Sequence, residues 1–166
     1  LVSIAIPVFN TARFLPAALD SVLAQDHVHW GALLGDDGST DGRGEIAADY
    51  AARDPRFRVL GNGRNNGVGV GAAAALTAAN GEYVCVLDSD DLLEADALSS
   101  MLAFMQAQPQ LGMAYSQYVE VDEHDAFLAN GTRFLKPYSP QRLLVDFMTY
   151  QFRLLRAEAY RSVGGF

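Results

Sequence analysis

Carboxylate groups follow two of the apolar runs in this 166-residue sequence, and they are the residues best suited to chemistry. Asp36 and Asp37 lie in the turn 35–38, and residues 88–91 read Asp-Ser-Asp-Asp. Carboxylates placed close together repel one another unless a counter-charge neutralises them. The hard oxygen ligands of aspartate favour Mg²⁺ or Mn²⁺, which commonly hold substrate phosphates as well. The two acidic segments therefore predict a divalent cation and a phosphorylated ligand.

Each acidic segment also has a purely structural interpretation. Asp-Asp-Gly at 36–38 is a common turn sequence, and the residues Ser-Thr-Asp at 39–41 are of the types that cap the start of a helix. The segment 88–91 is harder to explain in this way, because carboxylates directly after a buried strand cost stability unless they are solvated or bound to a metal. The presence of both segments at strand ends favours a function.

The elements that must position these residues alternate between strands and helices. Apolar runs predict strands at 1–9, 30–34, 56–60 and 82–87. Helical spacing or composition predicts helices at 12–25, 67–79 and 94–108. A further helix is predicted to begin at the capping residues 39–41 and to end at 53. This alternation predicts an α/β fold with a mainly parallel central sheet flanked by helices on both faces. Ligands bind such sheets beyond the carboxyl ends of the strands, where the ends of the first, second and fourth runs would converge.

The pattern changes beyond residue 110. Residues 112–121 and 126–135 predict two longer strands around the turn 122–125, as in an antiparallel hairpin. Residues 142–150 and 156–163 predict helices, with a strand at 151–155 between them.

Composition excludes several classes of protein. Half of the residues are hydrophobic, which is enough for a core and excludes a disordered tail. The chain has 12 basic and 20 acidic residues and a net charge of −8, which argues against binding to nucleic acid or an anionic membrane. Lys136 is the single lysine, which argues against a Walker-type phosphate loop, and Cys85 is the single cysteine, which excludes an intrachain disulfide.

Several short motifs, in this order and spacing, resemble those of the family 2 glycosyltransferases, which have the GT-A fold. They are the opening run 2–10 that ends Pro-Val-Phe-Asn, the helical segment 19–25, the acidic turn 36–41, the Asn-Asn-Gly turn 65–67, the segment 81–84, the segment 87–91 with its Asp-x-Asp, and the closing Val-Gly-Gly-Phe at 163–166. The resemblance covers nearly the whole chain and implies a Rossmann-like, GT-A architecture.

The resemblance implies transfer of a sugar from a nucleotide-diphosphate donor to an acceptor hydroxyl, with inversion at the anomeric carbon. It implies a nucleotide-sugar site made by Pro7, Val8, Phe9, Asp36, Asp37, Asp88 and Ser89. Within it, the first three residues would line the nucleobase pocket, and Asp36 or Asp37 would bind the base or the ribose. Asp90 would be the preferred metal ligand, with Asp88 as a second one nearer the ribose. An acidic chain could not easily hold a diphosphate without such an ion.

The resemblance also implies a cofactor and partners. The cofactor would be Mn²⁺ or Mg²⁺, the donor a nucleotide-diphosphate sugar with UDP favoured, and the acceptor a glycan or a lipid-linked molecule. No nucleic acid is expected, and a homodimer is left open. The role would be bacterial polysaccharide or cell-surface glycan synthesis in the cytoplasm, or at the inner face of the membrane through parts outside this chain.

The same resemblance divides the chain into a nucleotide-binding part, residues 1–108, and the start of an acceptor-side part, residues 109–166. The first residue is Leu1 and the chain stops at Gly-Gly-Phe, so we expect a single GT-A domain trimmed at its C-terminus. The family's general base follows Gly-Gly-Phe and would lie beyond Phe166. Asp122, Glu123 and Asp125 are acidic alternatives that we interpret as loop residues.

One departure concerns the nucleotide. Where the family often has an Arg-Asn pair in the helix after the Asn-x-Gly turn, this chain has Ala72 and Ala73. An arginine contact to the nucleotide is therefore missing unless Arg64 or Arg13 replaces it. This departure modestly favours an alternative function, a non-catalytic domain of the same fold that binds a nucleotide or a protein partner.

Two other enzyme classes fit less well. Sugar-phosphate nucleotidyltransferases have a similar architecture, but they carry a glycine-rich, basic loop after the first strand, whereas residues 10–13 read Asn-Thr-Ala-Arg. The segment 67–71 is rich in glycine, but it lacks the Gly-x-Gly-x-x-Gly order of a dinucleotide site and follows the third strand, not the first.

Overall fold

The computed structural model describes residues 1–36, 41–61, 68–143, 149 and 152–165. Asp37, Arg64, the turn 65–67 and Phe166 therefore lie outside the described residues. Within the described ranges, no helix is both long enough and apolar enough to span a lipid bilayer.

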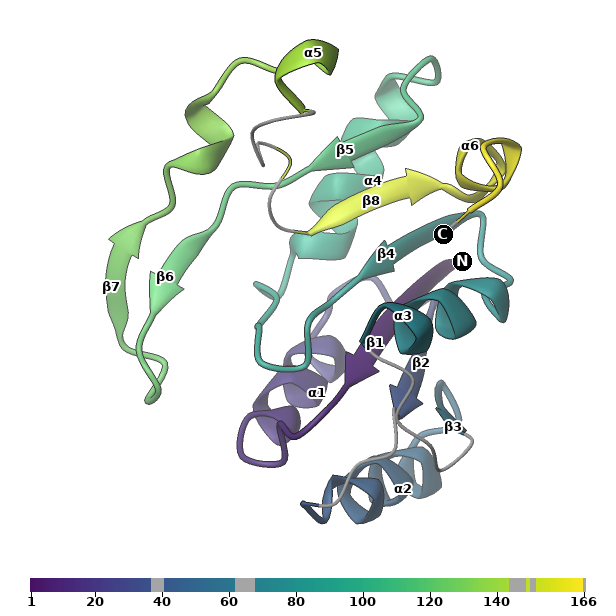
Figure 1. The fold of residues 1–166 in the computed structure, drawn as a ribbon, viewed down its shortest axis with the longest axis vertical. Coiled ribbons are helices and arrows are strands. Elements are labelled where there is room, and N and C mark those ends of the chain that lie inside the picture. Colours follow the sequence, from purple (N-terminus) through teal and green to yellow (C-terminus); the bar gives the residue numbers. More distant parts are fainter. Residues whose placement is uncertain (37–40, 62–67, 144–148, 150–151, 166) are drawn as a thin grey trace.

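Six strands form the central sheet in the order β3-β2-β1-β4-β8-β5 (Figure 1). Their bounds are Val2–Val8 for β1, Trp30–Asp36 for β2, Phe57–Gly61 for β3, Tyr83–Val86 for β4, Met113–Tyr115 for β5 and Arg153–Arg156 for β8. The first four strands are parallel, and β8 runs antiparallel to both of its neighbours. The predicted α/β fold with a mainly parallel sheet is confirmed.

Helices cover both faces of this sheet, as predicted (Figure 1). They are α1 (Leu15–Leu23), α2 (Arg43–Arg53), α3 (Val68–Thr77), α4 (Ala97–Ala107), α6 (Ala157–Ser162) and the single turn α5 (Pro140–Leu143). Buried residues of α1, α2 and α4 share the larger core, and those of α3 and α6 share a smaller one on the other face. Ile4 and Ile6 face the larger core and Ala5 the smaller, which explains the continuous apolar run of β1.

The predicted long strand at 112–121 is wrong, because the structure divides it between two sheets. β5 joins the central sheet, whereas β6 (Val119–Val121) pairs with β7 (Phe127–Asn130) in a separate antiparallel ribbon. The last residue of β5, Tyr115, lies opposite Arg153, the first residue of β8. The chain leaves the central sheet after this pair and continues into the separate ribbon.

One other segment differs from its prediction, and another is described only in part. The second hairpin strand, expected to reach residue 135, ends at Asn130, and a short 3₁₀ turn (Arg133–Leu135) follows. The helix predicted at 142–150 is described at its start, where residues 142 and 143 belong to α5, whereas 144–148 and 150 lie outside the described residues. The strand predicted at 151–155 and the helix predicted at 156–163 correspond to β8 and α6.

Gly81 sits where the chain enters β4 and passes close to the start of β1. Its backbone N–H donates to the buried Ser3 hydroxyl at 2.9 Å, and an added Cβ would lie 2.8 Å from Leu1 O, Ser3 N and Tyr83 O. We expect Gly81→Ala to lower the free energy of unfolding by about 1–3 kcal/mol, because backbone atoms cannot move aside as side chains do. Urea denaturation measures this loss.

The matched control is Gly44→Ala in α2, where an added Cβ would meet no atom within 4 Å. Alanine is the better helix former, so this variant should keep or raise the stability by up to about 1 kcal/mol. Equal effects of the two substitutions would contradict the close approach at Gly81.

Candidate functional site

The carboxyl ends of β1, β2 and β4 lie side by side at one edge of the sheet (Figure 1). Val8 at the end of β1 is opposite Asp36 at the end of β2, and on the other side Leu87 donates its backbone N–H to Ala5 O at 3.0 Å. Asp36 and the segment 88–90 therefore flank the end of β1, separated by two strand spacings, roughly 10 Å. The expected convergence of the acidic segments at one edge is found in the structure.

The loop after β1 is tied to the loops that follow β2 and β4. The Thr11 and Ser89 hydroxyls are hydrogen-bonded at 2.8 Å, and the backbone N–H of Ala12 donates to Asp41 Oδ2 at 3.0 Å. The prediction of Asp41 as a helix cap is wrong, because Gly42 occupies that position with a φ of +85°, a backbone conformation that glycine adopts without strain. The carboxylate of Asp41 holds two loops of the edge together instead.

The β6–β7 turn also reaches this loop. The Arg13 guanidinium donates to Glu123 Oε2 at 2.7 Å, and both side chains are more than half exposed. Arg13, one of the two arginines that could replace the missing nucleotide contact, is thus bound to an acidic residue of the turn. The other, Arg64, lies outside the described residues.

Asp88 and Asp90 are exposed at the edge, with the buried Ser89 between them. The pKa of Asp88 is raised, first because surrounding protein removes part of its hydration and second because the charge of Asp90 is close. The positive charge of Arg153 acts in the opposite direction. The pair is thus a site of unfavourable negative charge that a bound cation would relieve.

Arg153 also lies at this edge, although the sequence alone did not indicate it. It is the first residue of β8, and because β8 is antiparallel to β4, its first residue lies at the edge where the parallel strands end. The strand was predicted at 151–155, but nothing in its sequence indicates its direction within the sheet. Without that direction, the position of Arg153 beside Asp88 could not be predicted.

The residues expected at the nucleobase occupy different environments. Pro7 is buried, Val8 is 1% exposed and packs in the larger core, and Phe9 is 40% exposed. Phe9 therefore offers a side chain at the edge, whereas Val8 could offer only its backbone. Asp36 is half-buried at the end of β2, and Asp37 lies outside the described residues.

The donor atoms at this edge fit a hard divalent cation. In the described part of the chain, no three or more His, Cys, Asp or Glu side chains gather into a metal site. Mg²⁺ and Mn²⁺ need fewer protein ligands than that, because one or two carboxylates suffice when water and substrate phosphates complete the coordination. Asp88 and Asp90 provide two carboxylates of this kind.

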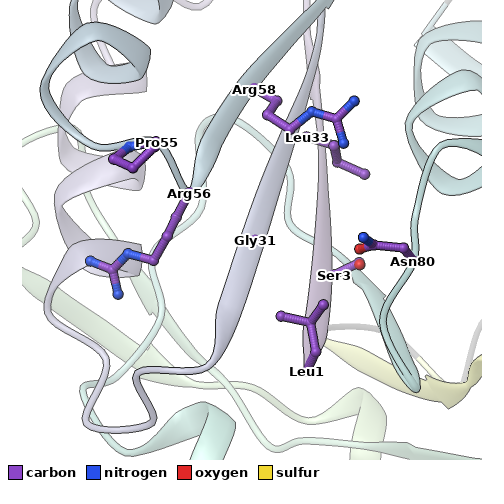
Figure 2. A pocket seen from close by; sticks show the side chains of 8 residues that line it. All are labelled: Leu1, Ser3, Gly31, Leu33, Pro55, Arg56, Arg58 and Asn80. Atoms are coloured by element: carbon purple, nitrogen blue, oxygen red, sulfur yellow. The ribbon is translucent and has the colours of Figure 1, made fainter.

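Two cavities among the described residues lie elsewhere. One, of about 190 Å³, lies between β1, β2 and β3 and the turn before β4, and Figure 2 shows Arg58 and Asn80 among its lining residues. The other, of about 390 Å³, lies between β5 and α4 and includes Phe104. Neither is lined by Asp36, Asp88 or Asp90. The candidate site is thus defined by the acidic edge, apart from these two cavities.

The hydrogen bond between Thr11 and Ser89 gives a direct test of how the edge is held together. Thr11→Val removes the hydroxyl and leaves the buried Ser89 hydroxyl without this partner. We expect a loss of about 1 kcal/mol in the free energy of unfolding, measured by urea denaturation. Thr11→Ser keeps the hydroxyl and should retain most of the stability, and a serine variant as unstable as the valine variant would refute the role of the bond.

A mainly parallel sheet with one antiparallel strand and an Asp-x-Asp segment at its carboxyl edge defines the class of the protein as a GT-A glycosyltransferase fold. The chain belongs to glycosyl transferase family 2, whose family model matches residues 3–164. The resemblance seen in the sequence motifs is confirmed.

One curated relative and two solved structures are similar to this chain. The chain is 31% identical over 166 residues to a chondroitin synthase of Escherichia coli, covering all of this chain and 24% of the relative. S. aureus TarS 1–349 in complex with UDP has a TM-score of 0.78 at 21% identity, with 98% of this chain and 48% of that chain covered. The mannosyltransferase PcManGT from Pyrobaculum calidifontis, in complex with GDP-Man and Mn²⁺, has a TM-score of 0.73 at 20% identity, covering 99% and 47%. The chain thus spans less than half the length of each of these proteins.

Proposed function

We propose that this chain is the donor-binding part of an inverting glycosyltransferase that moves a sugar from a nucleotide diphosphate to an acceptor hydroxyl. The observation that carries the proposal is the acidic pair Asp88 and Asp90 at the carboxyl edge of a family 2 fold. The named relatives support it, since one is a chondroitin synthase and two solved structures hold UDP or GDP-Man. By the same comparison, we propose a bacterial polysaccharide or surface glycan as the product.

Each residue of the edge would contact a different part of the donor. Asp90, with Asp88 beside it, would hold Mn²⁺ or Mg²⁺, while Asp36 and Phe9 would contact the ribose and the base. A bound ion supplies positive charge that stabilises the diphosphate leaving group. The hydrogen bonds that join the loops after β1, β2 and β4 would hold these residues at fixed positions relative to one another.

Inverting transfer needs a general base that deprotonates the acceptor hydroxyl. Two of the acidic side chains of the β6–β7 turn have structural contacts instead. Asp122 Oδ1 accepts the backbone N–H groups of His124 at 2.8 Å and Ala126 at 3.0 Å, so this carboxylate shapes the turn. Glu123 is paired with Arg13. These contacts support the interpretation of the turn as a structural loop, and we assign no base to it.

A second candidate is a non-catalytic domain that keeps the fold and binds a nucleotide. It is favoured by Ala72 and Ala73 in α3, where the family often has Arg and Asn. Such a domain would bind the donor without breaking its glycosidic bond.

Release of nucleoside diphosphate from UDP-GlcNAc and GDP-Man separates the candidates. With Mn²⁺ we expect slow release from one donor, accelerated by an acceptor glycan and lost in EDTA. Binding of a donor without release supports the non-catalytic domain. Release that persists after Asp88 and Asp90 are both replaced by asparagine contradicts the proposed site.

A further inference from the structure

We propose that Arg153 binds the diphosphate of the donor and replaces the arginine that the family pattern would place in α3. The inference rests on the proposed function and adds to it a specific cationic residue. A chain with a net charge of −8 needs local positive charge to hold a diphosphate, and one bound divalent ion cannot neutralise both the acidic pair and the phosphates.

The register of the sheet places Arg153 beside the acidic segment. Leu154 is opposite Cys85 in β4, so the preceding residue, Arg153, falls next to the last residue of β4, two positions before Asp88. The charge of Arg153 acts on Asp88 across this short distance. Because a guanidinium has five N–H donors, it can remain near Asp88 and still bind phosphate oxygens in a bidentate manner.

The alternation of side chains places Arg153 on the same face of the sheet as α3. Leu154 packs in the larger core beneath α1 and α4, whereas Leu155 packs against the smaller core that α3 covers. Successive residues of a strand point to opposite faces, so Arg153 shares the face of Leu155. This is the face on which Ala72 and Ala73 stand in place of the family's Arg and Asn.

The residue before β8, Phe152, is buried. Phe152 is 6% exposed and packs in the larger core, although its φ of +35° is in the left-handed region that phenylalanine rarely adopts. Such strain persists only where the surrounding structure over-determines it, and it is concentrated at functional sites. The buried ring thus anchors the strand next to a half-buried Arg153.

Arg13 and Arg156 are bound at other places in the structure. Arg13 is paired with Glu123 in the β6–β7 turn. Arg156, at the far end of β8, donates to Leu111 O at 2.9 Å, to Tyr83 Oη at 2.9 Å and to Met105 O at 2.7 Å. Its guanidinium joins β8 to β4, α4 and the loop before β5. Arg153 is the arginine of β8 placed at the acidic edge.

The test is the affinity of Arg153→Gln for UDP, UMP and uridine, measured calorimetrically with Mn²⁺. We expect UDP to bind about 10-fold or more weakly than to the unmodified protein, because a charge-assisted contact is lost, while uridine binds within about twofold. Arg153→Lys keeps the charge but cannot bind phosphate oxygens in a bidentate manner, so it should recover part of the affinity for UDP. The lysine variant also gives a result if the glutamine variant does not fold.

Arg58→Gln is the matched control, because it removes the same charge from β3 in the cavity of Figure 2, away from Asp88. It should leave the affinity for UDP unchanged. If Arg153→Gln binds UDP as tightly as the unmodified protein, or loses equal affinity for UDP and uridine, the inference about Arg153 is overturned and the proposed function is not. An unmodified protein that binds no UDP, with or without Mn²⁺, overturns the proposed UDP donor and this inference together.

Discussion

Replacement of Asp90 with asparagine is expected to remove Mn²⁺-dependent binding of UDP and leave the fold intact. Asp90 is exposed, so no core contact is lost, but the edge loses one of the two carboxylates that would hold the ion. Even changes to residues that only support a metal ligand weaken metal binding 10- to 100-fold, so we expect a loss of at least about that size. Calorimetric titration of UDP into the protein with Mn²⁺ measures it.

Glu94→Gln is the control for Asp90→Asn. It removes the same charge four residues further along, from an exposed side chain outside the Asp-x-Asp segment. Its affinity for UDP should equal that of the unmodified protein. If Asp90→Asn binds UDP as tightly as Glu94→Gln does, Asp90 is not a metal ligand.

Asp88→Asn is expected to change stability and nucleotide binding in opposite directions. The pKa of Asp88 is raised in the folded protein by loss of hydration and by the charge of Asp90. The folded state therefore binds the proton more tightly than the unfolded state, and stability falls as the pH rises from the ordinary aspartate pKa of about 3.9 through the raised value. Asparagine carries no charge, so the variant should unfold at a higher urea concentration at pH 7 and lose Mn²⁺-dependent binding of UDP.

The pH dependence makes this prediction specific. Near pH 3 the Asp88 carboxyl is protonated in both states, so the variant and the unmodified protein should differ little. Glu94→Gln again corrects for the general benefit of removing one negative charge from an acidic chain. An Asp88→Asn protein that is less stable than Glu94→Gln at pH 7 would show that Asp88 stabilises the fold instead of straining it.

Most of the fold could be predicted because its strands are buried on both faces. The runs 1–9, 30–34, 56–60 and 82–87 are continuously apolar, as strands covered by helices on two sides must be, and each became a strand of the central sheet. Their alternation with helices then determined the common edge at which Asp36 and Asp88 converge. The candidate site followed from this topology and not from any single motif.

The remaining features depend on contacts between distant segments. The split of 112–121 depends on which strands pair in three dimensions, and the environment of Arg153 follows from the antiparallel direction of β8. Residue types reveal neither. Similarly, Asp41 has the residue type of a helix cap, but its carboxylate accepts a hydrogen bond from Ala12, 29 positions away. Long-range partners of this kind override local preference, and only the three-dimensional structure identifies them.

A metal-dependent donor site is the central claim, and a thermal-unfolding panel tests it most directly. UDP, GDP, dTDP and CDP would each be added with Mn²⁺, with Mg²⁺ and with EDTA. A nucleotide at about 100 times its dissociation constant stabilises by roughly 2.7 kcal/mol, on the order of 5–10 °C for a domain of this size. We predict such a shift for one nucleotide, with UDP favoured, and its loss in EDTA and in Asp90→Asn. The absence of a shift with all four nucleotides, or a shift that survives EDTA, would contradict the claim.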